Sequence, residues 1–382
     1  MIEILIIVIV LILLVIYFYN KIYYQDISPR HTYSAEYYRG LNYLLNNEDE
    51  KALKIFTDLI DVDSSTIETH LALGGVYRRR GEFDKAILIH QNLLSRPNLD
   101  KEIKSQSLYE LSKDFFSAGL YDKSEKILLN LKSNKSYQES CTEFLLLTYE
   151  LSKDWDKAIN FGKSLNNEKL RNTSRTILIS QYYCEKADDY LKDDQANKAI
   201  TVLKKAIDVN NLCTRAYKSL FEINIKINQN LALDYLEKLI KINSTFLVIS
   251  STEILKLSST YQDPVLDKKI YEIILNYSKD NLFSPNLYEF IFNSNSYGTP
   301  KDYISKINDN LIIKIYDDLY TTKDNETKYY PELLTVIKYN YLTYNCSNCG
   351  YTSKSYIWQC PSCNNWETIE PNTIYERMLI DG

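Results

Sequence analysis

The fold is decided by Gly74-Gly75-Val76-Tyr77-Arg78-Arg79-Arg80-Gly81-Glu82-Phe83-Asp84-Lys85-Ala86, because parts of this segment recur along the chain. Its turn returns as Gly119-Leu120-Tyr121-Asp122-Lys123-Ser124 and Asp154-Trp155-Asp156-Lys157-Ala158, and a later copy reads Asn197-Lys198-Ala199-Ile200. Three pairs of like residues stand 34 positions apart: Gly40 and Gly74, Tyr43 and Tyr77, and Ala52 and Ala86. A fixed period of this length indicates a stack of similar supersecondary units.

Each unit is predicted to be a pair of antiparallel helices. Phe83, Ala86, Ile87, His90 and Leu94 recur at the spacing of one helical face. A small residue at the position of Gly74 is expected to let helix backbones approach closely. The pattern resembles the tetratricopeptide repeat, whose units stack into an α-solenoid that binds other proteins. We therefore predict an all-α chain with a solenoid over residues 35–338, in which the repeat frame is not fixed after 245.

The N-terminus carries a long apolar run. Ile2–Tyr19 contains one charge, Glu3, and its 18 residues would span about 27 Å as a helix, close to the thickness of a hydrocarbon core. A cleaved signal peptide would need early basic residues and a small-residue cleavage site, and both are missing. A run this long, apolar on every face and at the extreme N-terminus, favours a membrane span over a buried core helix. The sequence predicts one transmembrane anchor at 1–20, followed by a linker at 21–34.

Flanking cations predict the orientation of this anchor. Lys21, Arg30 and Arg39 follow the span, and no Lys or Arg precedes it. The positive-inside rule then places the rest of the chain in the cytoplasm.

Four of the seven cysteines form two C-x-x-C pairs near the C-terminus. Two such pairs with ten residues between them are typical of a tetrahedral thiolate site for one zinc or iron ion. Trp366 is expected to cover the metal, and the aromatic residues between the pairs are expected to form a small core. So small a unit needs metal binding to fold. We predict a metal module at 340–372 and a tail at 373–382, with the ligands Cys346, Cys349, Cys360 and Cys363.

The remaining composition argues against several function classes. The net charge is −5, and residues 340–382 hold more anions than cations, so a nucleic-acid partner is not expected. His70 and His90 lie on predicted repeat helices and are interpreted as packing or surface residues. The other three cysteines are interpreted as inert thiols. No catalytic or cofactor-binding residue is predicted apart from the metal ligands, and the chain is expected not to be an enzyme. The inert thiols are Cys141, Cys184 and Cys213.

An N-terminal anchor, a helical solenoid and a terminal four-cysteine module, in this order, resemble the lipopolysaccharide assembly protein B family of Gram-negative bacteria. The most specific likeness is rubredoxin-like: Cys346-x-x-Cys349-Gly350-Tyr351-Thr352, Trp358-x-Cys360-Pro361-Ser362-Cys363, and Trp366-x-Thr368-Ile369-x-Pro371. The resemblance implies a non-catalytic adaptor in the bacterial inner membrane that regulates lipopolysaccharide synthesis. Its implied partners are the membrane protease FtsH, the deacetylase that commits material to lipid A, and a membrane-embedded regulator protein.

Two other functions fit the same features. An iron tetrathiolate could make the chain a rubredoxin-like electron carrier on a membrane scaffold. The solenoid could also belong to a general membrane-anchored co-chaperone with many clients. Visible absorption by the metal would favour the first function, and capture of many unrelated chains would favour the second.

Overall fold

The computed structural model describes residues 38–58, 64–166, 169–170, 173–278, 284–293 and 342–373, apart from 41, 44, 45, 47 and 98, together with the isolated residues 303 and 318. In these ranges, no helix combines the length and the apolar character that crossing a membrane requires. The predicted anchor Ile2–Tyr19 and the linker lie outside the described residues. The chain divides into two compact units, Met1–Ser152 and Lys153–Gly382.

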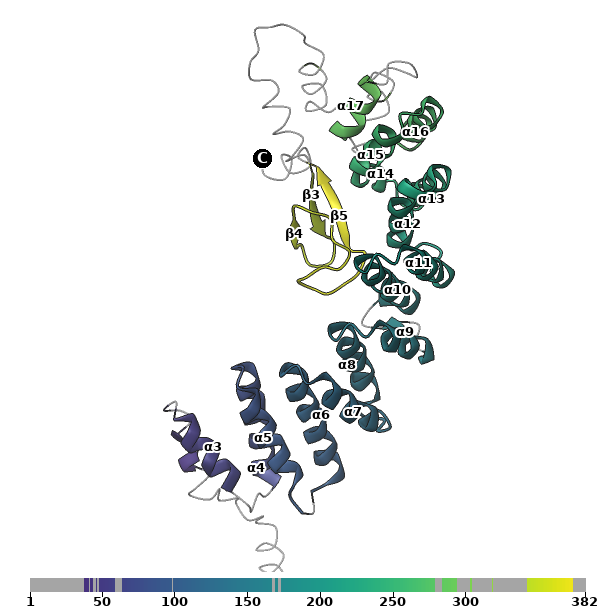
Figure 1. Ribbon diagram of the computed structural model, residues 1–382. Coiled ribbons are helices and arrows are strands. Elements are labelled where there is room, and N and C mark those ends of the chain that lie inside the picture. The colour runs from purple at the N-terminus through teal and green to yellow at the C-terminus, as the bar shows by residue number, and fades with distance from the viewer. Residues whose placement is uncertain are drawn as a thin grey trace, which may run out of the picture. The chain divides into compact units, whose positions relative to one another are not determined.

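The first unit is built from helix hairpins (Figure 1). Helix α4 packs on α5 and α6 packs on α7, as the repeat predicts, and α5 packs on α6. The turns inside the two hairpins contain Gly81 and Gly119 with φ of +80° and +75°, which glycine adopts without steric cost. The helices are α3 (Asp49–Asp58), α4 (Ser64–Arg79), α5 (Phe83–Leu94), α6 (Lys101–Ser117), α7 (Tyr121–Leu131) and α8 (Gln138–Leu151).

The small repeat residues have different roles from one another. Ala52 and Ala86 are completely buried, which fits close packing of their helices. Gly74 was expected to let two helix backbones approach closely. The structure shows instead that it makes room for the His90 side chain. A Cβ atom at Gly74 would lie only 2.4 Å from Cε1 of His90.

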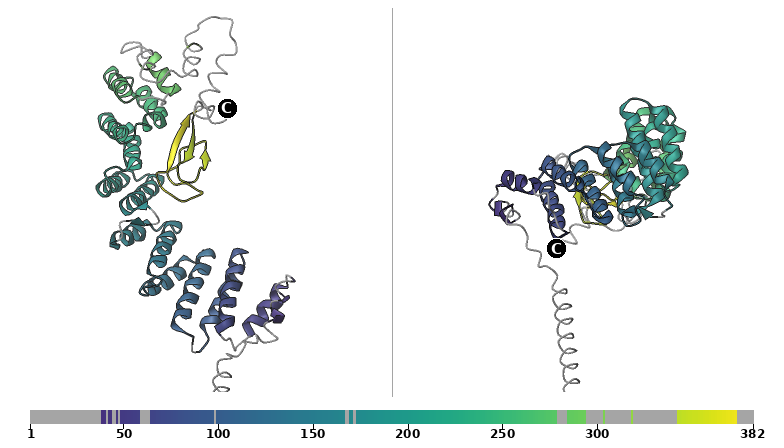
Figure 2. Two further views of the ribbon diagram at one scale, coloured as in Figure 1. Left: turned by 180° about the vertical axis from the view of Figure 1, so that it is seen from behind. Right: turned by 90° about the horizontal axis from the view of Figure 1, so that it is seen from below.

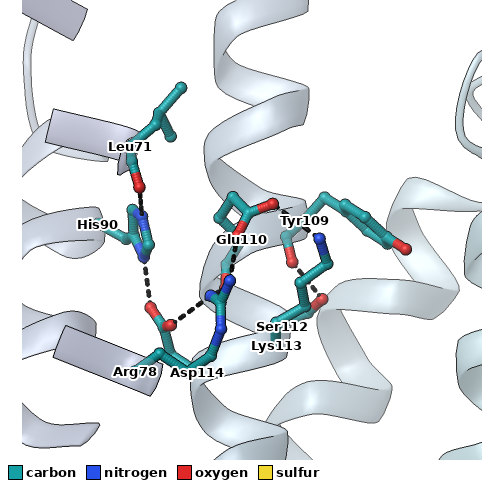
Figure 3. A network of polar contacts seen from close by, with 8 residues as sticks. All are labelled: Leu71, Arg78, His90, Tyr109, Glu110, Ser112, Lys113 and Asp114. Atoms are coloured by element: carbon teal, nitrogen blue, oxygen red, sulfur yellow. Dashed lines mark hydrogen bonds and ion pairs between the residues drawn. The ribbon is translucent and has the colours of Figure 1, made fainter. Parts of the chain in front are cut away.

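His90 belongs to a buried polar network that joins three helices of the first unit (Figure 3). Its Nδ1 pairs with Asp114 of α6, and its Nε2 lies 3.4 Å from the Leu71 carbonyl oxygen of α4. Arg78 donates to Asp114 Oδ1 and to Glu110 Oε2, both at 2.7 Å. Since every charge in the network faces an opposite charge or a polar atom, the network fixes α4, α5 and α6 in one arrangement.

The second unit continues the pattern of hairpins. Helix α10 packs on α11 and α12 packs on α13. Asn228 and Asp263 cap the N-termini of α13 and α16, and Pro264 occupies the first turn of α16. After residue 245, where the sequence does not fix the repeat frame, the described chain continues as the helices α14 to α17. The helices are α9 (Trp155–Ser164), α10 (Arg175–Lys192), α11 (Ala196–Val209), α12 (Thr214–Ile227), α13 (Gln229–Ile242), α14 (Phe246–Ile249), α15 (Ser251–Tyr261), α16 (Pro264–Tyr277) and α17 (Pro285–Asn293).

The C-terminal module is a small antiparallel sheet beside helices of the same unit (Figure 2). Strand β3 (Leu342–Cys346) lies between β4 (Thr352–Ser353) and β5 (Ile369–Thr373). Cys346 pairs with Ile369 across β3 and β5, and Tyr344 pairs with Ser353 across β3 and β4. A separate two-stranded ribbon, β1 (Lys169–Leu170) and β2 (Thr173–Ser174), precedes α10. The described chain is thus mostly helical and tetratricopeptide-like, with one small β module.

Candidate metal centre

The structure brings the four C-terminal cysteine sulfurs together. All four Sγ atoms lie within 4.8 Å of one another. The Sγ atoms of Cys346 and Cys363 are 3.7 Å apart, and those of Cys349 and Cys360 are 3.6 Å apart. A tetrahedral ion with metal–sulfur bonds of about 2.3 Å holds its sulfurs about 3.8 Å apart. The cluster could therefore bind one metal ion as a tetrathiolate, and its donor atoms suit zinc or iron.

Two similar turns present these sulfurs. In the first turn, the Gly350 N–H donates to the Cys346 carbonyl oxygen, and in the second the Asn364 N–H donates to the Cys360 carbonyl oxygen. Gly350 and Asn364 both have positive φ, of +74° and +55°. Glycine and asparagine are the residues that tolerate this backbone conformation best. Asn364 was not singled out from the sequence, although it has the place in the second turn that Gly350 has in the first.

Local hydrogen bonds make the thiols unequal. Burial opposes ionisation of Cys346, but the Thr368 hydroxyl and the backbone N–H groups of Cys349 and Asn348 outweigh it and lower the Cys346 pKa to about 6. Burial raises the pKa of Cys360 to about 11. A metal ion binds the thiolate form of cysteine. Cys346 therefore ionises readily without the metal, whereas Cys360 loses its proton only when the metal ion binds.

Side chains of the module pack on helix residues as well as on one another. Tyr344, Cys346, Cys360 and Ile369 form the buried core of the module, and Ile249 of α14 packs against it. Phe246 of α14 stacks on Trp358 with ring centroids 5.7 Å apart, and it meets Tyr356 edge-on at 5.6 Å. The aromatic residues between the cysteine pairs therefore continue the core of the helical unit.

Arg215 of α12 is the central polar contact between helices and module. Its side chain is 5% exposed, and it pairs with Glu185 at 2.8 Å and Asp188 at 2.6 Å, both on α10. Its guanidinium carbon lies 5.9 Å from the ring centre of Trp358 and 5.5 Å from that of Trp366. Trp366 was expected to cover the metal, and the structure places it against this arginine. A cation on an aromatic face is stabilised most where water is excluded.

Gln181 and Glu367 form a second polar contact. Gln181 Nε2 of α10 donates to Glu367 Oε1 at 2.8 Å. Burial raises the pKa of Glu367 to about 7, against the attraction of Arg215 and the hydrogen bond from Gln181. Glu367 also has φ of +56°, a conformation that costs a residue with a side chain about 1 kcal/mol. This half-buried acid in a strained backbone conformation joins the module to α10, and no local pattern in the sequence signals it.

Comparisons with known proteins agree with this description. A family model described as "Rubredoxin metal binding domain" matches residues 344–371, and a "Tetratricopeptide repeat" model matches residues 69–104. Among solved structures, the MamA protein is similar at 19% identity with a TM-score of 0.30, and the similarity covers 48% of this chain and 94% of that one.

Two curated relatives are similar over most of the chain. The proteins named "Lipopolysaccharide assembly protein B" from Escherichia coli K12 and Haemophilus influenzae are 27% and 28% identical to it. In each case the similarity covers 88% of this chain and 89% of the relative. The resemblance to the lipopolysaccharide assembly protein B family is therefore confirmed, and the chain is a distant relative of these proteins along most of its length.

Proposed function

We propose that this chain is a non-catalytic adaptor of the bacterial inner membrane that regulates lipopolysaccharide synthesis. The observation that carries the proposal is the similarity over 88% of the chain to proteins named for lipopolysaccharide assembly. Tetratricopeptide-like hairpins and a docked metal module support a scaffold role, because stacked helix pairs offer long surfaces to protein partners.

In this proposal, Ile2–Tyr19 anchors the chain as a single-pass helix with the C-terminal regions in the cytoplasm. The anchor occupies 1–20, the linker 21–34, the solenoid 35–338, the module 340–372 and the tail 373–382. Confinement of an adaptor, a protease and a client to one membrane surface raises their effective concentration without new contacts. Deletion of Ile2–Tyr19 should leave a folded protein that functions poorly.

The metal has a structural role in this proposal. Cys346, Cys349, Cys360 and Cys363 would ligate one zinc or iron ion, which leaves no open coordination position for a substrate. Colourless protein with one zinc per chain would support the structural role. The visible absorption of a ferric tetrathiolate would favour the alternative electron carrier.

A groove between α4 and α6 is the proposed docking surface for one partner. It encloses about 510 Å³, and its lining includes Ala72, Gly75, Val76 and Arg79 of α4 and Gln106 of α6. Val76 is 36% exposed, and the exposed residues Ala72 and Arg79 line the same groove. The buried network around His90 fixes the two walls, which reduces the ordering cost of binding (Figure 3).

The proposed partners are the protease FtsH, the deacetylase that commits material to lipid A, and a membrane-embedded regulator. Affinity capture of the full chain from membranes tests this set. One protease and one biosynthetic enzyme are expected, whereas many unrelated chains would indicate a co-chaperone. Val76→Glu, inside the groove, should weaken the capture of the partner that docks there at least tenfold. Val265→Glu is the matched control, because Val265 of α16 is 65% exposed and lies outside the groove.

A further inference from the structure

A second pair of sulfurs lies outside the metal centre. Cys184 belongs to α10, and Cys213 is the N-cap residue of α12. Their Sγ atoms are 3.7 Å apart, and both side chains are fully buried. Neither residue belongs to the cluster of four metal-site cysteines. The sequence favours inert thiols at both positions, and their separation of 29 residues gives no sign of the contact.

The two thiols have different environments. Cys213 accepts hydrogen bonds from the Cys184 thiol and from the Ala216 backbone N–H, and these lower its pKa although burial acts the other way. Burial raises the pKa of Cys184 well above the ordinary value. A thiolate at a helix N-terminus beside a protonated thiol has the two roles of a redox pair, a nucleophile and a resolving group.

We propose that Cys184 and Cys213 form a redox-responsive thiol pair, which a hydroperoxide converts to a disulfide between α10 and the start of α12. The Cys213 thiolate attacks hydrogen peroxide, so that an S–O bond forms, the O–O bond breaks and hydroxide leaves. The Cys184 sulfur then displaces hydroxide from the sulfenic acid, and its own proton completes a water molecule. Overall, two thiols and one hydrogen peroxide give one disulfide and two waters.

The local structure permits hydrogen peroxide to reach the thiols and the two sulfurs to close to bonding distance. Cys213 is fully buried and its neighbour Leu212 is 60% exposed, so peroxide reaches the thiol when the start of α12 opens locally. Helix ends open locally at low cost, and hydrogen peroxide is about the size of water. The sulfurs must close from 3.7 Å to about 2.05 Å, which small movements of the N-cap residue can provide.

The same site contacts the docked module. Gln181 Nε2 lies 3.9 Å from Cys213 Sγ while it donates to Glu367 Oε1. The disulfide would thus form beneath a docking contact, separate in chemistry from the metal thiolates. The proposal is independent of the adaptor function, since it concerns the oxidation state of two named residues.

Peptide mapping of the full chain in detergent tests the proposal. The reduced, zinc-loaded protein is treated with one equivalent of hydrogen peroxide, and free thiols are then alkylated. Tryptic cleavage leaves Cys184 and Cys213 in the separate peptides 176–186 and 206–215, each with a single cysteine. The expected product is these two peptides joined by a disulfide, at more than half occupancy, with the zinc content unchanged and reversal by dithiothreitol.

Three variants give the controls. Cys184→Ser and Cys213→Ser should each abolish the joined peptide, and Cys141→Ser, which removes another buried thiol, should leave its yield unchanged. The proposal is overturned if wild-type protein gives no joined peptide at peroxide doses that oxidise Cys141, or if the joined peptide forms only after zinc has been lost. Because the decisive measurement uses wild-type protein, poor folding of a variant does not affect it.

Discussion

The C-terminal module and the α4–α6 region solve the problem of stability in different ways. The α4–α6 region buries apolar residues from neighbouring helices, such as Leu71 and Leu93, and encloses a polar network whose charges are paired. The module has few buried residues of its own and depends on a possible metal site and on helix residues such as Phe246 and Arg215. A small domain needs stabilising groups from outside its own core, whereas a repeat needs only its neighbour.

Metal removal should have the largest effect, because it should unfold the module and leave the α4–α6 region folded. Structural zinc binding contributes on the order of 10 kcal/mol, so a chelator should unfold residues 342–373 entirely. Hydrogen exchange on the full chain should then show loss of protection in β3 and β5 and unchanged protection in α4–α6. Cys346→Ser should have the same effect, and Cys141→Ser is the control. Protection of β3 and β5 that survives complete metal removal would contradict a metal-dependent fold.

Loss of Arg215 should release the module without unfolding the helices. Arg215→Met keeps an apolar side chain against Trp358 and Trp366 but removes the charge that faces Glu185 and Asp188. The two ion pairs join α12 to α10, whereas the contact with the module is the cation on the two tryptophan rings. Such a contact contributes about 2 kcal/mol where water is excluded, so exchange in β3 and β5 should become about 30-fold faster. Arg79→Met, at an exposed position of α4, should leave the rate unchanged. An equal effect of both substitutions would mean that Arg215 has no special part in docking.

The sequence predicted the local features of both regions. The helix hairpins follow from apolar periodicity, and the clustering of the four sulfurs follows from two C-x-x-C pairs, because these signals depend on residues close in the chain. The docking contacts could not be predicted, since Gln181 and Glu367 are 186 residues apart. Trp366 was expected to cover the metal, and the sequence could not show that Arg215, 151 residues earlier, packs on its ring. The role of Gly74 depends in the same way on the rotamer of His90.

Docking of the module should also depend on pH through Glu367. Its pKa is raised from 4.5 to about 7 by burial, so the folded protein binds this proton more tightly than the unfolded chain does. The stabilisation is complete below pH 4.5 and is lost as the pH rises through 7. Glu367→Gln keeps an acceptor for Gln181 and should flatten the pH profile, with a gain of about 2 kcal/mol at pH 8.

Urea unfolding followed by tryptophan fluorescence measures this effect, because two of the three tryptophans lie in the module. Glu370→Gln, at an exposed position of β5, is the matched control and should keep the wild-type profile. A wild-type profile that is flat between pH 4.5 and 8 would show that Glu367 does not titrate in this range.

The smallest expected effect concerns two neighbouring glycines in α4. Alanine favours a helix over glycine by about 1 kcal/mol. Gly75→Ala should therefore stabilise the protein, because its Cβ would meet two arginine ends only at ordinary van der Waals distances of 3.6 Å or more. At Gly74 the new Cβ would lie 2.4 Å from Cε1 of a His90 ring that Asp114 holds in place. Overpacking costs 1–3 kcal/mol, which outweighs the gain in propensity, so Gly74→Ala should destabilise by about 1 kcal/mol. The thermal unfolding temperature of the full chain should therefore rise for Gly75→Ala and fall for Gly74→Ala, while exchange in β3 and β5 stays unchanged. A shift in the same direction for both variants would mean that the His90 ring moves aside without cost.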